Sequence, residues 1–366
     1  MRIAIEINWG QKRGGARRYA IESVRQMSLQ SPGYSFIIIS SIYFKELSAK
    51  NISYRIIKKP SYLPTVLWDQ IIFPHIIVPL QVNRIKPNVT LFTNNICPVY
   101  CKGKIIVSIL DMTPFIIPEH YRYFHGLYQR LYISYASKYA GKVITISNNS
   151  AKDISTILNK SISDIDVVYC GNNMDSIVPQ LTKRIESIIP ERYILFVGAI
   201  HPRKNVLNLI KAFHQSDLAA KMDHKLIVVG AKRWQINKAI GNDNTGENII
   251  FISDVEDSEL AYLYCHCELF AFPSFYEGFG LPVLEAMSFG APIITSNTSS
   301  LREIAEGAGV LIDPFSIDDI SEAMLKIASN SRYRKLLRIK SYARSSLYSW
   351  ESTAKLMLQV IEKEKI

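Results

Sequence analysis

Short apolar runs alternate with stretches of helical periodicity along almost the whole chain, and this alternation most constrains the fold. Strand-like runs lie at residues 2–7, 36–40, 89–92, 105–109, 142–146 and 166–168, then at 193–198, 225–229, 249–252, 269–272, 292–295 and 309–311. Alternating strands and helices are typical of βαβ units, so we expect an α/β protein with doubly wound parallel sheets. A chain of 366 residues is long for one domain, which favours two.

The alternating pattern weakens between the two halves, where Pro179 and Pro190 interrupt it. We therefore expect a first domain at residues 1–175, a linker at 176–191 and a second domain at 192–342. The remaining residues, 343–366, have helical periodicity and form a separate C-terminal helix in this interpretation.

A glycine-rich turn with a glutamate at each end follows the apolar run at 269–272. Glu277 is expected on the loop and Glu285 on the helix after it, with Gly278, Phe279, Gly280 and Leu281 in the turn and Pro282 as the first helical residue. A helix start attracts phosphate, whereas carboxylates accept hydrogen bonds from hydroxyls. This layout suits a nucleotide-diphosphate sugar; the alternative is a capped helix with two solvated glutamates.

A second strand-to-helix junction carries two basic residues. The run at 193–197 ends at Gly198, and Arg203 and Lys204 precede the helical pattern that starts at Val206. Ligands of parallel α/β sheets bind beyond the carboxyl ends of the strands, and arginine and lysine both grip phosphates. Taken alone, this pair would be read as an exposed basic turn; the two junctions together favour a diphosphate site.

These motifs resemble a known family. The residues that carry the resemblance are the 277–285 stretch with Phe272-Pro273-Ser274 before it and Ala286-Met287 after it, together with residues 198–205, 299–304 and 311–314. The chain resembles retaining GT-B glycosyltransferases of the family 4 type, especially bacterial mannosyltransferase-like members of surface-polysaccharide or lipopolysaccharide assembly. The resemblance implies two Rossmann-like domains with a cleft between them and a last helix that crosses back to the first domain.

The resemblance also implies roles for these residues. Glu277 would bind the donor sugar's hydroxyls and Glu285 the ribose hydroxyls, while Arg203 and Lys204 would stabilise the leaving diphosphate without a metal. The remaining donor-binding positions of the second domain would be Gly198, Gly278, Phe279, Gly280 and Leu281.

The first domain has weaker matches to the same family. Gly15 and Arg18 resemble its glycine loop, and Asp111 resembles the aspartate of its His-Asp-x-x-Pro segment, although Leu110 replaces the histidine. In relatives that histidine lies near C6 of the donor sugar, so its loss suggests a 6-deoxy donor such as rhamnose or fucose. Asp111 is equally well interpreted as a catalytic or as a structural aspartate.

The expected reaction is therefore transfer of a hexose or deoxyhexose, mannose or rhamnose/fucose, from a GDP- or dTDP-sugar. The expected acceptor is a growing, lipid-linked polysaccharide, and no cofactor is needed. Two alternatives stay open: a nucleotide-sugar-binding scaffold without activity, and a glycoside hydrolase that uses paired carboxylates.

Composition limits the partners and the compartment. The net charge of +11 calls for anionic partners, namely phosphorylated substrates or, as an alternative, an anionic membrane surface; no nucleic-acid module is recognisable. Five cysteines in no regular spacing favour a reducing cytoplasm. No signal peptide is expected, because Glu6 lies inside the short apolar run at residues 2–7, and no transmembrane helix is expected, because Pro74, His75 and Pro79 interrupt the longest apolar region. The basic run in 332–344 is interpreted as a solvated helix face.

Overall fold

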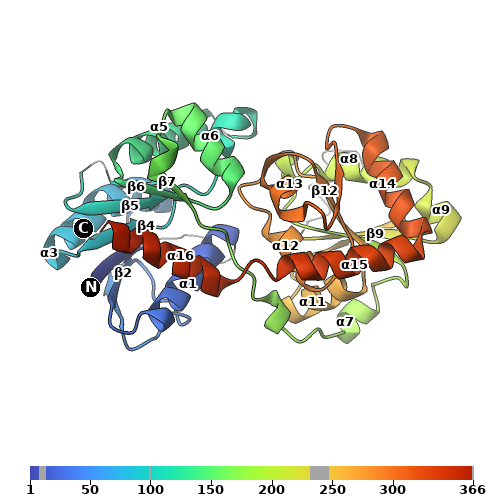
Figure 1. Cartoon of the computed structure of the whole chain (residues 1–366), viewed down its shortest axis with the longest axis horizontal. Coiled ribbons are helices and arrows are strands. Elements are labelled where there is room, and N and C mark those ends of the chain that lie inside the picture. Colours follow the sequence, from blue (N-terminus) through green and yellow to red (C-terminus); the bar gives the residue numbers. More distant parts are fainter. Residues whose placement is uncertain (8–13, 99, 122, 231–246, 365–366) are drawn as a thin grey trace. The chain divides into compact units, whose positions relative to one another are not determined.

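The computed structural model describes residues 1–7, 14–98, 100–121, 123–230 and 247–364. The chain divides into two compact units, Met1–Gly171 with Tyr348–Ile366, and Asn172–Leu347 (Figure 1). Residues 176–191, expected as a linker, fall within the second unit. There Glu259 holds α7 (Lys183–Glu186) in place. Its carboxylate accepts a hydrogen bond from the Thr182 hydroxyl at 2.6 Å and forms an ion pair with Arg184 at 2.6 Å.

Each unit contains one sheet in which every pair of neighbouring strands is parallel. The first has the order β3-β2-β1-β4-β5-β6-β7 and the second β10-β9-β8-β11-β12-β13. Their bounds are β1 Arg2–Glu6, β2 Ser35–Ser40, β3 Ile52–Ile56, β4 Val89–Phe92, β5 Lys104–Ser108, β6 Lys142–Thr145, β7 Ile165–Val167, β8 Tyr193–Val197, β9 Lys225–Val229, β10 Ile249–Ile252, β11 Leu269–Phe272, β12 Ile293–Ser296 and β13 Val310–Ile312. The predicted α/β class with two Rossmann-like parallel sheets is confirmed.

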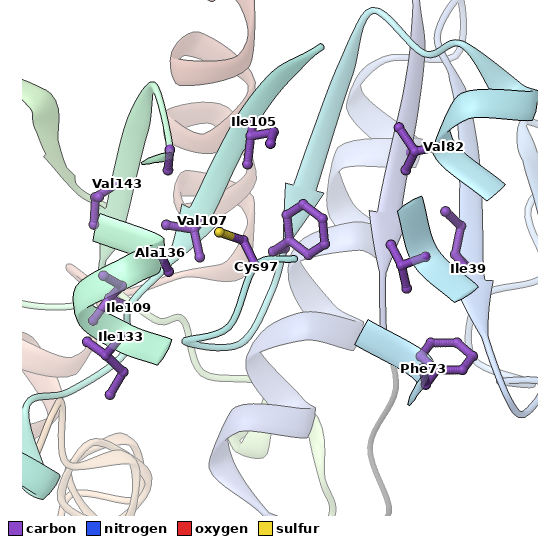
Figure 2. Packing of buried hydrophobic residues seen from close by; sticks show 14 of the residues in the cluster. Ile39, Phe73, Val82, Cys97, Ile105, Val107, Ile109, Ile133, Ala136 and Val143 are labelled. Carbon is purple, nitrogen blue, oxygen red and sulfur yellow. The ribbon is translucent and has the colours of Figure 1, made fainter. Parts of the chain in front are cut away.

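Helices cover both faces of the first sheet (Figure 1). The face with Ile37, Ile39 and Val107 packs against α5 (Tyr123–Tyr139), α6 (Asn148–Leu158) and the helical segment Thr65–Ile85, as the cluster in Figure 2 shows. The other face is covered by α1 (Gly15–Gln30), whose Tyr19 hydroxyl lies 3.3 Å from the Ser108 hydroxyl, and α16 (Trp350–Lys363) lies against α1. The C-terminal helix thus belongs to the first unit.

The other α-helices of the described residues are α4 (Thr113–Ile116), α8 (Val206–Gln215), α9 (Leu218–Met222), α11 (Asp257–His266), α12 (Leu281–Ser288), α13 (Ser299–Ala305), α14 (Ile317–Ser329) and α15 (Ser331–Ser345). The sequence suggested that the basic run on α15 is a solvated helix face, but two of its arginines donate hydrogen bonds to backbone carbonyls. Arg338 donates to the carbonyl oxygens of Cys265, Cys267 and Gly290, and Arg334 to those of Ile327 and Ala328. Arginine N–H groups thus satisfy carbonyls that the ends of α11 and α14 leave unpaired.

The expectation that prolines break the apolar region near Pro74 is wrong. The helical segment Thr65–Ile85 is continuous over 21 residues, as α2 (Thr65–Leu67), η1 (Trp68–Ile77) and α3 (Val78–Ile85). Its central part, η1, is a π-helix, in which hydrogen bonds run from i to i+5; Pro74 lies within it, and Pro79 lies in the first turn of α3. By length and composition this is the one helix in the described residues that could cross a membrane, although a third of its most apolar window is buried in the protein.

Candidate functional site

The two predicted strand-to-helix junctions of the second unit are neighbours. They follow β8 and β11, which pair directly, and β8 is the point at which the strand order of this sheet reverses. Such a reversal leaves a crevice at the carboxyl ends of the strands, where ligands of open α/β sheets bind. The topology therefore places the 198–205 and 273–280 loops at one binding edge.

Hydrogen bonds tie the two loops together. The carbonyl oxygen of Arg203 accepts from the Phe275 backbone N–H at 2.9 Å and lies 3.0 Å from the Ser274 hydroxyl. The buried Asn205 side chain donates to the carbonyl oxygens of Pro273, at 2.9 Å, and Pro314, at 2.6 Å. Asn205 has a left-handed backbone with φ of 59°, a conformation that asparagine tolerates better than most residues. These hydrogen bonds hold the residues of one loop at fixed distances from those of the other.

Glu277, Arg203 and Lys204 form one cluster, as their predicted common role requires. The Glu277 carboxylate pairs with Arg203 Nη1 through Oε2 and with Lys204 Nζ through Oε1, both at 2.6 Å. The same Oε1 accepts from the Ser274 hydroxyl at 2.6 Å. Lys204 Nζ also lies 4.6 Å from the centre of the Phe272 ring, a cation–π distance. The three charged side chains carry a net charge of +1.

The Glu277 carboxyl is held in its ionised form. Burial by itself would raise its pKa, but the charges of Lys204 and Arg203 and their hydrogen bonds outweigh burial and lower the pKa from 4.5 to about 2. Because Glu277 is only 7% exposed, those charges act on it with little screening. A carboxylate in this state accepts hydrogen bonds and is a poor proton donor at neutral pH.

A close backbone approach shapes the turn between Glu277 and α12. Gly280 has a φ of 110°, and a Cβ there would lie 2.7 Å from Leu301 Cδ2. Gly278 and Phe279 complete this turn, Leu281 is the first residue of α12, and the Ser300 hydroxyl lies 2.8 Å from the carbonyl oxygens of both Glu277 and Phe279. The start of α12 is therefore held in place by α13.

Glu285 is buried one turn into α12, and only 7% of it is exposed. Its Oε2 accepts a hydrogen bond from the Tyr264 hydroxyl at 3.1 Å. The two glutamates are thus held differently, one by two cations and the other by a tyrosine.

Several supporting residues were not predicted: Ser274, Asn205, Ser300 and Tyr264. Ser274, Asn205 and Ser300 lie inside motifs that carry the family resemblance, and that was their only signal in the sequence. Tyr264 lies on α11, 21 positions before Glu285, and no local pattern connects the two.

The predicted residues of the first unit have local backbone roles. Asp111 Oδ1 accepts from the Thr113 N–H at 3.0 Å, at the start of α4, and the buried Leu110 donates its N–H to Asn95 Oδ1 at 2.8 Å. Gly15 begins α1, and the Arg18 N–H donates to the Gly14 carbonyl at 3.1 Å. Residues 8–13 of the predicted glycine loop lie outside the described part of the chain.

Gly198 directly follows β8, and its N–H donates to the Val229 carbonyl oxygen at 3.0 Å. Among the described residues, no group of three or more histidine, cysteine, aspartate or glutamate side chains is arranged to hold a metal ion.

Residues 180–346 match the family model described as "Glycosyl transferases group 1". The chain is 36% identical over 163 residues to O-antigen chain mannosyltransferase B of Escherichia coli, an alignment that covers 44% of this chain and 43% of that protein. The chain thus matches less than half the length of this curated relative.

Solved structures match almost the whole chain at low identity. Sucrose-phosphate synthase from Thermosynechococcus elongatus superposes with a TM-score of 0.78 at 18% identity, covering 99% of this chain and 98% of that one. WaaG, a glycosyltransferase involved in lipopolysaccharide biosynthesis, gives a TM-score of 0.76 at 16% identity, covering 98% and 99%. These similarities establish the GT-B fold.

Proposed function

We infer that the protein is a hexosyltransferase that uses a nucleotide-diphosphate sugar as donor, because residues 180–346 match the group 1 glycosyl transferase model. One observation carries the proposal: the Glu277, Arg203 and Lys204 cluster lies at the strand-order reversal, next to the start of α12. Cations and a helix start suit a diphosphate, and an ionised carboxylate suits sugar hydroxyls.

In the proposed reaction, an acceptor hydroxyl oxygen attacks the anomeric carbon as the bond from that carbon to the diphosphate oxygen breaks. Negative charge builds up on the leaving diphosphate, which Arg203 and Lys204 would stabilise together with the α12 start. Arginine has five N–H donors and lysine three, so each can contact Glu277 and a phosphate oxygen at once. In the retaining mechanism that the family resemblance implies, the departing phosphate accepts the acceptor's proton.

The roles of the two glutamates follow from how they are held. We propose that Glu277 orients the donor sugar by accepting hydrogen bonds from its hydroxyls, and that Glu285 binds the ribose. The lowered pKa of Glu277 disfavours this residue as the general acid of the glycoside hydrolase alternative, because that carboxyl must keep its proton to protonate the leaving group. Asp111, Gly15 and Arg18 stay proposed contributors from the first unit, with Gly198 and residues 278–281 as further donor contacts.

For the donor we propose a GDP- or dTDP-sugar that carries mannose or, because Leu110 replaces the family histidine, a 6-deoxy sugar. Mannose is favoured by the similarity to O-antigen chain mannosyltransferase B. The proposed acceptor is a lipid-linked saccharide of surface-polysaccharide or lipopolysaccharide assembly, reached from the cytoplasmic side of the membrane. No resident metal or cofactor is part of the proposal.

The test is mass spectrometry of products after incubation with GDP-mannose, GDP-fucose or dTDP-rhamnose and a membrane extract, with Glu277→Gln as the inactive control. Growth of a lipid-linked glycan by one sugar in the wild type alone supports the proposal. Free sugar without nucleotide dependence indicates a hydrolase, and binding of the nucleotide sugar without transfer indicates a scaffold. Faster turnover of GDP-mannose than of both 6-deoxy donors refutes the inference drawn from Leu110.

A further inference from the structure

The helical segment Thr65–Ile85 in the first unit presents apolar side chains on two sides. On the inner side, Trp68, Phe73 and Val82 belong to the core cluster that packs on the sheet, and Phe73 and Val82 are labelled in Figure 2. Four large apolar residues on the outer side are exposed: Leu67 by 38%, Ile71 by 45%, Ile76 by 51% and Leu80 by 49%. Core packing therefore leaves part of this segment's apolar surface in water.

The π-helical geometry of η1 keeps these outer residues together. They are spaced by four, five and four residues, and the five-residue step from Ile71 to Ile76 spans Pro74 within η1. With hydrogen bonds that run from i to i+5, residues five apart lie near one another on the helix surface. An ordinary α-helix would rotate Ile76 away from Ile71.

The helix α5 lies beside η1 and carries exposed apolar side chains of its own. It contacts η1 through the Tyr128 hydroxyl, which donates to the Gln70 carbonyl oxygen, and through the Tyr132 ring, 4.4 Å from the His75 ring. On α5, Phe124 is 81% exposed and Leu131 61%. We call Leu67, Ile71, Ile76, Leu80, Phe124 and Leu131 the outer apolar surface.

Basic residues outnumber acidic ones in the part of the chain that contains the helical segment Thr65–Ile85. Residues 51–105 contain one acidic residue, Asp69, against seven basic ones: Arg55, Lys58, Lys59, Arg84, Lys86, Lys102 and Lys104. Apart from Lys59, which donates to the Leu63 carbonyl oxygen, these basic side chains are exposed. The same surface of a second copy of this chain would be positively charged and would be repelled, whereas anionic lipid headgroups would be attracted.

We propose that the outer apolar surface docks the first unit on an anionic lipid bilayer. Its apolar side chains enter the boundary between headgroups and acyl chains, and the surrounding lysines and arginines contact the headgroups. The segment does not cross the bilayer, because Trp68, Phe73 and Val82 hold its inner side in the protein core. This inference goes beyond the proposed transfer reaction and does not depend on it.

The test is sedimentation of the full chain with phosphatidylcholine vesicles, with and without phosphatidylglycerol. Wild-type protein should bind the anionic vesicles, and Ile76→Glu should lower the bound-to-free ratio at least about tenfold, since it removes a buried isoleucine and places a charge in the apolar layer. The matched control is Ile339→Glu on α15, where isoleucine is 68% exposed on a basic helix of the second unit. That variant should bind like the wild type.

Lys58→Ser with Arg84→Ser provides a second test that leaves the apolar packing intact. This double variant should lose the preference for anionic over neutral vesicles. Failure of the wild type to bind, equal losses in Ile76→Glu and Ile339→Glu, or an unchanged lipid preference would each overturn the proposal. So would a wild-type dimer, seen by light scattering, that only Ile76→Glu dissociates. Transfer to a soluble acceptor should be the same in all variants, which separates this outcome from failure of the proposed function.

Discussion

The two units use the same parallel α/β architecture but treat their candidate site residues differently. In the second, Glu277, Arg203 and Lys204 come from two loops and meet in one buried cluster. In the first, Asp111 accepts a hydrogen bond from the first residue of a short helix and Gly15 begins a long one. In the proposed function, the donor is therefore gripped by residues of the second unit.

The largest expected effect is a loss of turnover caused by substitutions in the second unit. Arg203→Ala and Lys204→Ala should each lower kcat about 10²- to 10³-fold, because each removes a preorganised positive group from the site of charge development. Steady-state assays with the donor identified by product analysis would measure this. Lys221→Ala is the control, since Lys221 is exposed on α9 and pairs only with Asp217 in the described contacts.

The contrast between the two units would be wrong if a substitution in the first unit lowered kcat more than Arg203→Ala or Lys204→Ala does. Asp111→Asn keeps a side-chain oxygen for the Thr113 N–H and should change kcat much less than Arg203→Ala. A greater loss in Asp111→Asn would make that aspartate catalytic and would move the centre of the chemistry to the first unit.

The next largest effect is on the stability of the first unit alone. A Cβ on Gly171 would lie 2.1 Å from the backbone nitrogen of Trp350, at the start of α16. Gly171→Ala should therefore displace α16 and lower the free energy of unfolding of the first unit by about 3 kcal/mol. Hydrogen exchange resolved by residue would show this loss in the first unit and unchanged protection in the second. Gly33→Ala is the control, because no atom lies within 4 Å of the added Cβ.

The sequence predicted the strands of the second unit well, because β9, β10 and β11 are apolar runs bounded by polar residues. It missed β3, an edge strand whose Tyr54 and Arg55 give no apolar run. It also predicted Glu277, Arg203 and Lys204 at one site, since parallel topology brings the carboxyl ends of neighbouring strands together. It could not predict that Tyr264 donates to Glu285 or that Ser300 holds the turn, because these contacts depend on how α11 and α13 pack.

A pH effect should distinguish the buried cluster from ordinary surface charges. The pKa of Glu277 is lowered from 4.5 to about 2, so its ionisation stabilises the fold above pH 4.5 and this contribution is lost as the pH falls towards 2. Glu277→Gln should be less stable than the wild type at neutral pH, by on the order of 2 kcal/mol, and the difference should shrink below pH 4. Urea denaturation at pH 7, 5 and 3 would measure it. A difference that stays constant with pH would contradict the assignment, and the exposed Glu306→Gln provides the baseline.

The smallest expected effects separate the two glutamates of the second unit. Glu285→Ala should raise the Kd for the free nucleoside diphosphate about tenfold and change kcat little, since the proposed ribose contact is made equally in the ground and transition states. Tyr264→Phe removes the hydroxyl that donates to Glu285 Oε2 and should raise the same Kd a few-fold, in line with roughly 1 kcal/mol for one hydrogen bond. Isothermal titration calorimetry would measure both. If Tyr264→Phe weakened binding as much as Glu285→Ala, the tyrosine itself would contact the ligand; if neither changed it, the ribose would bind elsewhere and Glu285 would serve only to pack α12 against α11.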